Sequence, residues 1–229
     1  MITSPNPDTS KKAQRRPNLS VTSQNVRGFS AATSIEKRDE LAHSMKKHNV
    51  DVACLQETWS FEDEDVIIHG HLFILHGGPS RRGGVGLVLS PRAIKAWERA
   101  GQPDPIKSGN IAGRERSIAI ELHYLDSAAQ VVKYFVVSSY APWCNGNFSD
   151  GDYSEYLLNL EEKILQRCPA DAIPIIGIDA NASIGDVISD DYGETIQHPC
   201  DVAGKFGVRQ QSERSEPFTN FLSENGLCS

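Results

Sequence analysis

The sequence predicts an α/β protein built around a mixed β-sheet. Short runs of β-branched and apolar residues alternate with segments whose apolar residues recur at helical spacing. Several predicted strands follow one another without an intervening helix, which favours a mixed rather than a purely parallel sheet. With 229 residues, the chain can bury a sizeable core as one domain or as two small ones.

The first half of the chain is expected to be mostly β-strand. Strands are predicted at residues 19–26, 51–57, 85–90, 117–125 and 131–142. One helix is expected among them, at residues 34–49, because apolar residues recur there at helical spacing and cations come late, where the helix dipole favours them.

The clearest helix is predicted at residues 152–167. Asp152 and Glu155 are a plausible capping pair, and Pro169 ends the helix. Its apolar stripe consists of Tyr156, Leu157, Leu160, Ile164 and Leu165. A last short helix is expected near "SEPFTNFLSEN", after a loop rich in Asp and Gly.

The stretch "IPIIGIDANASIG" at residues 173–185 predicts a strand buried on both faces, followed by Asp179 and Asn181. One interpretation of these two residues is turn chemistry, because Asp and Asn side chains bond the local backbone where a strand ends. The other is a functional site, because a period of two places both side chains on one face, where they could share a water or a phosphate oxygen. The stretch alone leaves both interpretations open.

Charge and cysteine content narrow the function classes. The net charge of −7 argues against a general nucleic-acid coat, whose affinity depends on Lys and Arg, but it suits an enzyme that holds Mg²⁺. The five cysteines are widely spaced without a CxxC pair, which indicates a reducing, intracellular compartment. No apolar run is long enough to span a bilayer, so no membrane partner is expected.

Residues 1–17 are rich in Pro, Ser and charge and are expected to form a disordered basic arm. Its four cations could contact phosphates or direct nuclear import, although a solvated tail is the simpler interpretation. Residues 18–229 would then form the folded domain.

Four predicted strands end in polar residues of the kind that handle a cation and a phosphate. These are Asn25, Glu57, Tyr140, and Asp179 with Asn181. Each has a local explanation, such as a turn, a solvated strand end or a core tyrosine. Because ligands collect outside the carboxyl ends of strands in open α/β sheets, the set together predicts a site.

The motifs "SQNVRG", "LQET", "GGVGLVLS", "SSYAP" and "DANASIG" occur in this order. In order and rough spacing they resemble the endonuclease/exonuclease/phosphatase superfamily, most closely the apurinic-type endonuclease domain of non-LTR retrotransposons. "GKFGVRQQSERSEPFTNFLSENGL" is similar to the segment that follows the Asp-x-Asn motif there, so the resemblance covers about residues 18–228. It implies an α/β fold in which a two-sheet mixed β-sandwich is flanked by helices.

The resemblance also implies a role for each strand-end residue. Glu57 would ligate Mg²⁺, or Mn²⁺ in its place, with Asn25 beside it. Tyr140 would bond the scissile phosphate, Asp179 would orient or deprotonate the attacking water, and Asn181 would hold the phosphate or the water. DNA would be the partner, and no protein partner is expected.

Two departures from the family pattern matter. Arg27 stands where the apurinic enzymes have an acidic residue. The closing strand with its aspartate and the "Ser-Asp-His" motif are absent, and the last histidine is His198. We therefore expect an incomplete domain that lacks its last strands and shows little or no hydrolysis, since losing one positioned donor costs on the order of 10²–10³ in rate.

Three functions remain open from the sequence. The first is a Mg²⁺-dependent endonuclease that nicks DNA, and the second is another phosphodiesterase or phosphatase of the superfamily, acting on RNA or on a small phosphorylated molecule. The third is a non-catalytic retroelement remnant.

Other signals are weaker. His69, His71 and His76 could suggest zinc, but a pair at a strand edge is the expected reading. The segment 61–65, "FEDED", reads as a solvated acidic loop rather than a second metal site. Arginines 81 and 82 could lie near DNA phosphates, and arginines 114 and 116 could face substrate or pair with the acidic loop.

Overall fold

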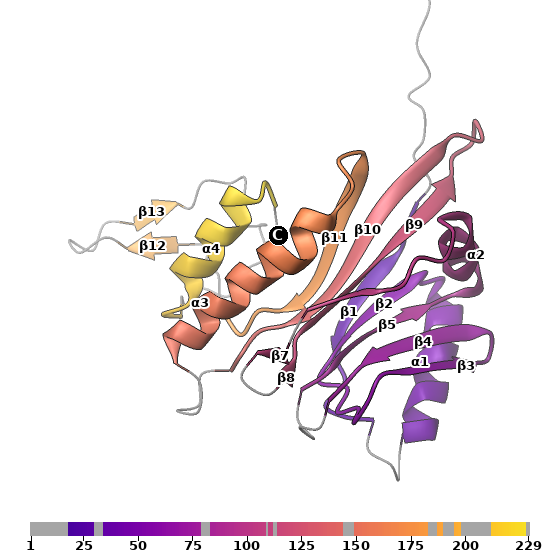
Figure 1. Cartoon of the computed structure of the whole chain (residues 1–229), viewed down its shortest axis with the longest axis horizontal. Helices are drawn as coiled ribbons and strands as arrows, with labels where there is room; N and C mark the ends of the chain where they lie inside the picture. The colour runs from indigo at the N-terminus through magenta and orange to yellow at the C-terminus, as the bar shows by residue number, and fades with distance from the viewer. Residues whose placement is uncertain are drawn as a thin grey trace, which may run out of the picture.

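Two β-sheets pack face to face, with helices against their outer sides and one helix packed into the core between them (Figure 1). The computed structural model describes residues 18–29, 34–78, 83–108, 110–111, 114–143, 149–182, 187–189, 195–197 and 212–227. The architecture confirms the predicted α/β class with two mixed sheets flanked by helices. The predicted basic arm at residues 1–17 lies outside the described residues.

The first sheet has five strands in the order β1-β2-β5-β4-β3. Their bounds are β1 Val21–Asn25, β2 Val52–Gln56, β3 Glu64–Ile68, β4 His71–His76 and β5 Val85–Leu89. β1 and β2 are parallel, whereas the other neighbours are antiparallel. The parallel pair matters for function, because both strands end at the same edge of the sheet.

The second sheet has four strands in the order β11-β10-β9-β6. Their bounds are β6 Ile106–Lys107, β9 Ser117–Leu125, β10 Val131–Tyr140 and β11 Ala172–Asp179. β10 and β11 are parallel and also end together. Two small hairpins lie apart from the main sheets: β7 Asn110–Ile111 with β8 Arg114–Glu115, and β12 Val187–Ser189 with β13 Thr195–Gln197.

Four α-helices pack on these sheets. They are α1 Ser34–His48, α2 Pro91–Arg99, α3 Asp150–Asn159 and α4 Ser215–Glu224. α1 packs on the first sheet through Ala42 and Met45, and α3 and α4 cover the second sheet beside β10 and β11 (Figure 1). The predicted first and last helices are therefore confirmed. None of the helices in the described ranges is long and apolar enough to cross a membrane.

The sheets approach each other closely at Gly177 in β11. A Cβ atom there would lie 2.3 Å from the Cβ atom of Cys54 in β2, so only glycine fits. Burial in this contact raises the pKa of the Cys54 thiol to about 12, which keeps it protonated and inert. β11 and β2 are thus pressed together two residues before Asp179.

The structure corrects the predicted start of the long helix. Ser149 is the cap: its hydroxyl accepts the backbone N–H of Asp152, whose carboxylate accepts the backbone N–H of Ser149. The Asp152 carboxylate therefore forms the capping pair with Ser149, which precedes it, rather than with Glu155, which follows it. After α3 the chain widens into a π-helical turn at Leu160–Ile164 and then tightens into a 3₁₀ turn at Leu165–Arg167, so the predicted end of the helix is right.

Two further predictions were wrong, and one helix was missed. β11 is half-buried rather than buried on both faces, because it is the outermost strand of its sheet among the described residues. The "FEDED" segment is only partly a loop, since β3 begins at Glu64, whose carboxylate binds the guanidinium of Arg38 at 2.7 Å. α2 was not predicted, although Ser90 caps it and Pro91 suits its first turn.

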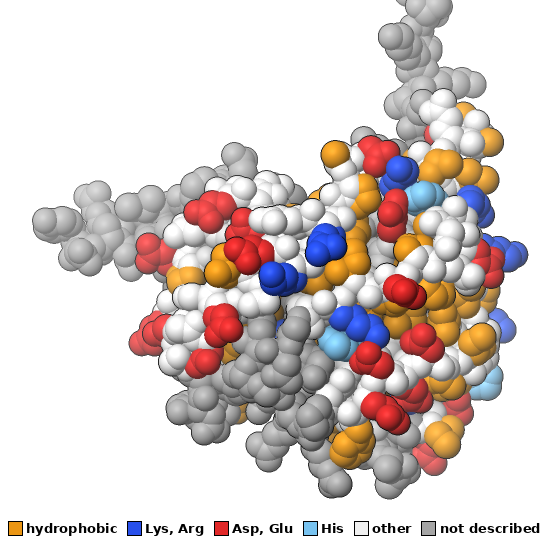
Figure 2. Space-filling view, viewed as in Figure 1, with side chains coloured by type: hydrophobic (Ala, Val, Ile, Leu, Met, Phe, Trp, Pro, Cys, Tyr) orange, Lys and Arg blue, Asp and Glu red, His pale blue; other side chains and the backbone are white. Residues whose placement is uncertain are grey.

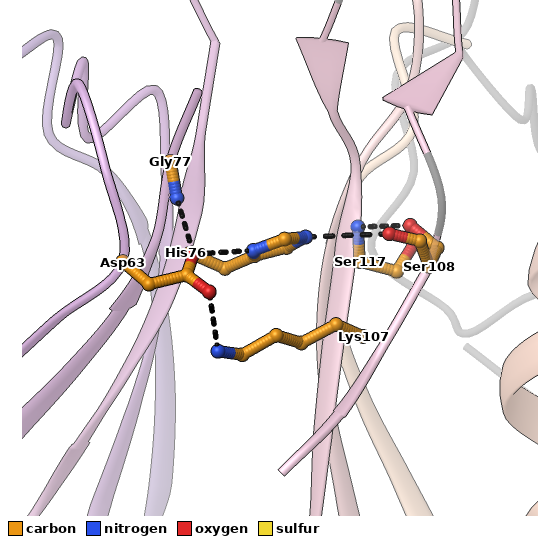
Figure 3. Close-up of polar contacts among 6 residues, drawn as sticks. All are labelled: Asp63, His76, Gly77, Lys107, Ser108 and Ser117. Atoms are coloured by element: carbon orange, nitrogen blue, oxygen red, sulfur yellow. Dashed lines mark hydrogen bonds and ion pairs between the residues drawn. The ribbon is translucent and has the colours of Figure 1, made fainter. Parts of the chain in front are cut away.

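A polar cluster joins the two sheets at a distance from their apolar core (Figure 3). His76 of β4 lies between Asp63, 2.8 Å from its Nδ1 atom, and the carbonyl oxygen of Ser108, 3.3 Å from its Nε2 atom. Lys107 of β6 donates to the same Asp63 carboxylate at 2.6 Å. The first sheet is therefore connected to the second by an ion pair as well as by packing.

Candidate active site at the ends of four strands

The parallel strand pairs bring the predicted polar residues to one edge of the sandwich. Asn25 is in register with Gln56 at the end of the β1–β2 pair, and Tyr140 is in register with Asp179 at the end of the β10–β11 pair. Glu57 directly follows β2. Each sheet therefore contributes two of these side chains to the same edge.

Asn25 connects the two carboxylates of the site. Its Nδ2 atom donates to Glu57 Oε1 at 2.8 Å and to Asp179 Oδ2 at 2.9 Å. The Tyr140 hydroxyl donates to the same oxygen of Glu57 at 3.0 Å. Four of the five predicted site residues, up to 154 positions apart in the chain, thus form one hydrogen-bonded group.

Asn181 adjoins this group through the backbone. Its N–H donates to Asp179 Oδ1 at 3.3 Å, and its side-chain amide donates to the carbonyl of Ala141 at 2.8 Å. Asp179 therefore forms a local turn with one oxygen and contacts Asn25 with the other. The "DAN" stretch thus forms the expected local turn and also contacts the strand-end group, while its functional role stays a prediction.

Left-handed backbone conformations surround the site. Arg27, Glu57 and Asn181 have φ values of +48°, +54° and +45°, which residues other than glycine rarely adopt. Each costs on the order of 1 kcal/mol and persists only where surrounding contacts hold it. At Arg27 and Asn181, that contact is a hydrogen bond from the backbone N–H to the side chain two residues earlier.

Beneath the carboxylates lies a buried polar layer that the sequence analysis missed. The Gln56 amide donates to the Ser138 hydroxyl at 3.3 Å and to the Gly177 carbonyl at 3.2 Å. Ser23 of β1 bonds the same amide, and Ser138 donates to the Leu55 carbonyl at 2.9 Å. Because this layer joins both sheets, it sets the spacing of the residues above it.

Tyr140 is almost fully buried, and its environment keeps the phenol protonated. Burial and the adjacent Glu57 carboxylate raise the pKa of Tyr140 to about 12. Arg116 lies behind it, with its guanidinium carbon 5.1 Å from the ring centroid and Nη1 3.4 Å from the Tyr140 carbonyl oxygen. The structure thus places Arg116 in the core, whereas a position facing substrate or the acidic loop was considered from the sequence.

A cleft of about 670 Å³ opens beside these residues. It is lined by Ser23, Asn25, Gln56, Trp143, Ile178, Asp179, Ala180, Asn181, Ala182 and Phe218. Glu57 and Tyr140 adjoin the cleft through their hydrogen bonds with Asn25 and with each other. Trp143 was not singled out from the sequence, because a lone tryptophan after "YAP" carries no periodic signal.

The donor set of the site suits a hard cation. Glu57 and Asp179 offer carboxylate oxygens, and Asn25 offers an amide oxygen. Mg²⁺ typically takes one or two protein carboxylates and completes its shell with water and substrate oxygens. Within the described ranges no three His, Cys, Asp or Glu side chains are grouped to hold a metal.

Each of the three histidines considered for zinc contacts a different partner. His69 pairs with Asp39 at 3.3 Å and lies edge-on to His43, whereas His71 contacts the His69 carbonyl. His76 belongs to the inter-sheet cluster in Figure 3. Arginines 81 and 82, the side chain of Arg114, and His198 lie outside the described part of the chain.

Basic side chains are spread over the surface. On the face shown in Figure 2, Lys and Arg side chains are interspersed with Asp and Glu, in keeping with the net charge of −7. Arg27 and Lys37 line a second hollow on the other side of Asn25.

Comparison with solved structures identifies similar folds. The catalytic domain of Xenopus laevis APE2 is 15% identical with a TM-score of 0.52, and the match covers 89% of this chain and 66% of that one. An AP endonuclease from Archaeoglobus fulgidus is also 15% identical with a TM-score of 0.52, and that match covers 90% of this chain and 70% of the other. This chain spans about two thirds of the length of those proteins. At this identity the likeness shows a shared fold.

At the level of sequence, no curated protein matches the chain. The family profile described as "Endonuclease/Exonuclease/phosphatase family" matches residues 22–184, a segment that includes all five predicted site residues. Members of this family are metal-dependent hydrolases. On this match, together with the two-sheet fold, the chain belongs to the endonuclease/exonuclease/phosphatase family.

Proposed function

We propose that this chain hydrolyses phosphodiester bonds of DNA with Mg²⁺, as a nicking endonuclease of the retroelement type. The observation that carries the proposal is the shared hydrogen bonding of Glu57 and Asp179 to one Asn25 amide at the mouth of a cleft. Two carboxylates held this close repel each other, and a cation bound beside them would offset that repulsion. The order of the retroelement-like motifs supports the DNA substrate.

Glu57 and the amide oxygen of Asn25 would hold the metal. When bound there, Mg²⁺ supplies Lewis-acid stabilisation of the phosphoryl charge and of the leaving oxygen. Mn²⁺ suits the same oxygen donors. The Asn25 amide hydrogens remain directed at the carboxylates, so this residue separates the two negative groups while contributing its oxygen to the cation.

Asp179 would position the attacking water and accept its proton. Two N–H groups orient its carboxylate, one from the Asn25 amide and one from the Asn181 backbone. A carboxylate within hydrogen-bonding reach of a water can serve as its general base. Asn181 lines the same cleft and would hold the water or a phosphate oxygen.

Tyr140 would donate a hydrogen bond to the scissile phosphate. Its raised pKa keeps the O–H proton in place throughout the neutral range. Arg116 and the surrounding core hold the ring, and the single O–H proton, which donates to Glu57 in the structure, would turn to the phosphate when substrate binds. Such preorganised donors act on charge that develops in the transition state.

The test is nicking of supercoiled plasmid by the purified chain in Mg²⁺. We expect slow conversion to the open circle that EDTA stops and that Glu57→Gln reduces about 100-fold or more. Glu162→Gln changes an exposed carboxylate distant from the cleft in sequence and structure, and should leave the rate unchanged.

Other outcomes discriminate among the alternatives. Glu57-dependent hydrolysis of RNA or of a small phosphate ester, without nicking of DNA, would assign a different substrate within the superfamily. A folded chain that hydrolyses none of these substrates would refute the enzyme proposal and favour the non-catalytic remnant.

A further inference from the structure

Trp143 is a large apolar side chain exposed beside the candidate active site. It is 58% exposed, whereas Ala141 and Pro142, directly before it, are buried. The same tryptophan lines the cleft that contains Asn25, Asp179 and Asn181. A single exposed apolar side chain is common on protein surfaces, so its position at the cleft is what points to a ligand.

The backbone leading to Trp143 is held from several sides. Ala141 donates its N–H to the Asp179 carbonyl at 2.9 Å and accepts the Asn181 side-chain amide at 2.8 Å. The Pro142 carbonyl accepts a hydrogen bond from buried Arg214. Trp143 therefore extends from a fixed segment tied to the site residues themselves.

The lining of the cleft combines polar and apolar side chains. Its polar lining consists of Ser23, Asn25, Gln56, Asp179 and Asn181, and its apolar lining consists of Trp143, Ile178, Ala180, Ala182 and Phe218. A phosphodiester held at the polar part would place the attached nucleoside against the apolar part. Phe218 is nearly buried in the wall, whereas Trp143 keeps open surface available for stacking.

We propose that Trp143 stacks on an unpaired base adjacent to the phosphate that the site hydrolyses. This inference rests on the proposed function and specifies its substrate as single-stranded or locally unpaired DNA. Stacking of a base on an aromatic side chain is worth about 5- to 150-fold in affinity per base and tolerates any base, because every base has a π-face. A base within a duplex is already stacked on its neighbours.

The test is a binding titration of the full chain with two fluorescein-labelled single-stranded DNA oligomers, followed by anisotropy in Ca²⁺ to prevent hydrolysis. One oligomer carries normal bases, and the other carries abasic tetrahydrofuran residues at its central positions. We expect the wild-type chain to bind the first about tenfold more tightly. Trp143→Leu should bind both oligomers equally, and Trp143→Phe should retain most of the preference.

Phe61→Leu is the matched control, since Phe61 is 55% exposed but does not line the cleft. It should preserve the tenfold preference. Equal binding of both oligomers by the wild-type chain would overturn the stacking role, as would equal weakening of both by Trp143→Leu. Tighter binding of a duplex than of the single strand would overturn the preference for unpaired bases.

These failures are distinct from failure of the proposed function. Glu57-dependent nicking reports on hydrolysis and does not require a preference between the two oligomers. A chain that nicks plasmid but binds both oligomers equally retains the proposed function and loses only the stacking role.

Discussion

Tyr140 is at once a core residue and a member of the candidate site. Its ring is buried against Arg116, and its hydroxyl reaches Glu57 at 3.0 Å. The local interpretation, a core tyrosine with a satisfied hydroxyl, and the functional one describe the same side chain. Burial keeps the phenol neutral, and a neutral donor is what a phosphate oxygen requires.

Tyr140→Phe separates the two roles. The ring remains, so the free energy of unfolding should fall by only about 0.5–1.5 kcal/mol, the usual contribution of one hydrogen bond. Mg²⁺-dependent nicking should fall about 100-fold, because the positioned donor is lost. Urea titration and plasmid nicking measure the two effects.

Tyr124→Phe is the control for that experiment. It removes a phenol from β9, away from the residues that line the cleft, and should leave nicking unchanged. A Tyr140→Phe variant that nicks at the wild-type rate would show that the Tyr140 hydroxyl serves only the fold.

At the scale of the element, β11 controls the geometry of the site. Gly177 lets the strand approach β2, and its carbonyl accepts the buried Gln56 amide. Asp179 follows two residues later, at the register position opposite Tyr140. The Ile-rich pattern predicts this strand, but the need for glycine comes from a contact with a strand more than 100 residues earlier.

Gly177→Ala should disturb both stability and activity. The added methyl group would lie 2.3 Å from the Cys54 Cβ atom, so the sheets must shift apart. We expect a loss of about 1–3 kcal/mol in the free energy of unfolding, as for other overpacked cores. Nicking should fall as well, because Asp179 would move away from Asn25. Urea titration and the plasmid assay check both.

Gly151→Ala provides the comparison. Its added methyl group would lie no closer than 3.3 Å to another group, the Ser149 hydroxyl, and alanine favours the helix. The variant should lose much less stability than Gly177→Ala, because the Ser149 side chain needs to give way by only a few tenths of an ångström. Equal behaviour of the two variants would contradict the proposed tight contact at Gly177.

At the scale of the molecule, the candidate site depends on how the two sheets are held together. Asn25 and Glu57 come from the first sheet, and Tyr140 and Asp179 come from the second. Relative movement of the sheets would break the Asn25 hydrogen bonds. The cluster in Figure 3 opposes such movement through Asp63, which binds His76 of one sheet and Lys107 of the other.

This cluster makes stability depend on pH. Burial opposes ionisation of Asp63, but hydrogen bonds from Lys107 and His76 outweigh burial and lower the pKa of Asp63 below its usual 3.8. A lowered pKa in the folded state stabilises the fold above the unfolded-state value, and this contribution disappears as the pH falls through the folded-state value.

Asp63→Asn should therefore be less stable than the wild-type chain at pH 7. The difference should shrink once the pH falls below about 3.8, when the wild-type carboxyl group also becomes neutral. Urea titrations at several pH values measure it. A difference that stays constant down to the lowest pH at which the chain folds would contradict the ionic role of Asp63.

Much of this architecture follows from local pattern. Runs of β-branched and other apolar residues predict β2, β5, β9, β10 and β11, and helical periodicity predicts α1 and α3. Both patterns depend only on residues that are close together in the sequence. Asn25, Glu57, Tyr140 and Asp179 could be predicted as site residues because each belongs to a short local motif at the end of a strand. The prediction failed where a neighbour in space decided the outcome, as at the half-buried β11 and at β3.

Packing between distant segments decided the rest. The shared amide of Asn25, the Gln56 layer, the burial of Arg116 and the exposure of Trp143 depend on how one sheet lies on the other. The spacing of residues in the sequence does not give the distance between the two sheets, because the two halves of the site are some 150 residues apart in the chain. The chain thus specifies its strands and their polar ends locally, and only the contact between sheets turns those ends into one site.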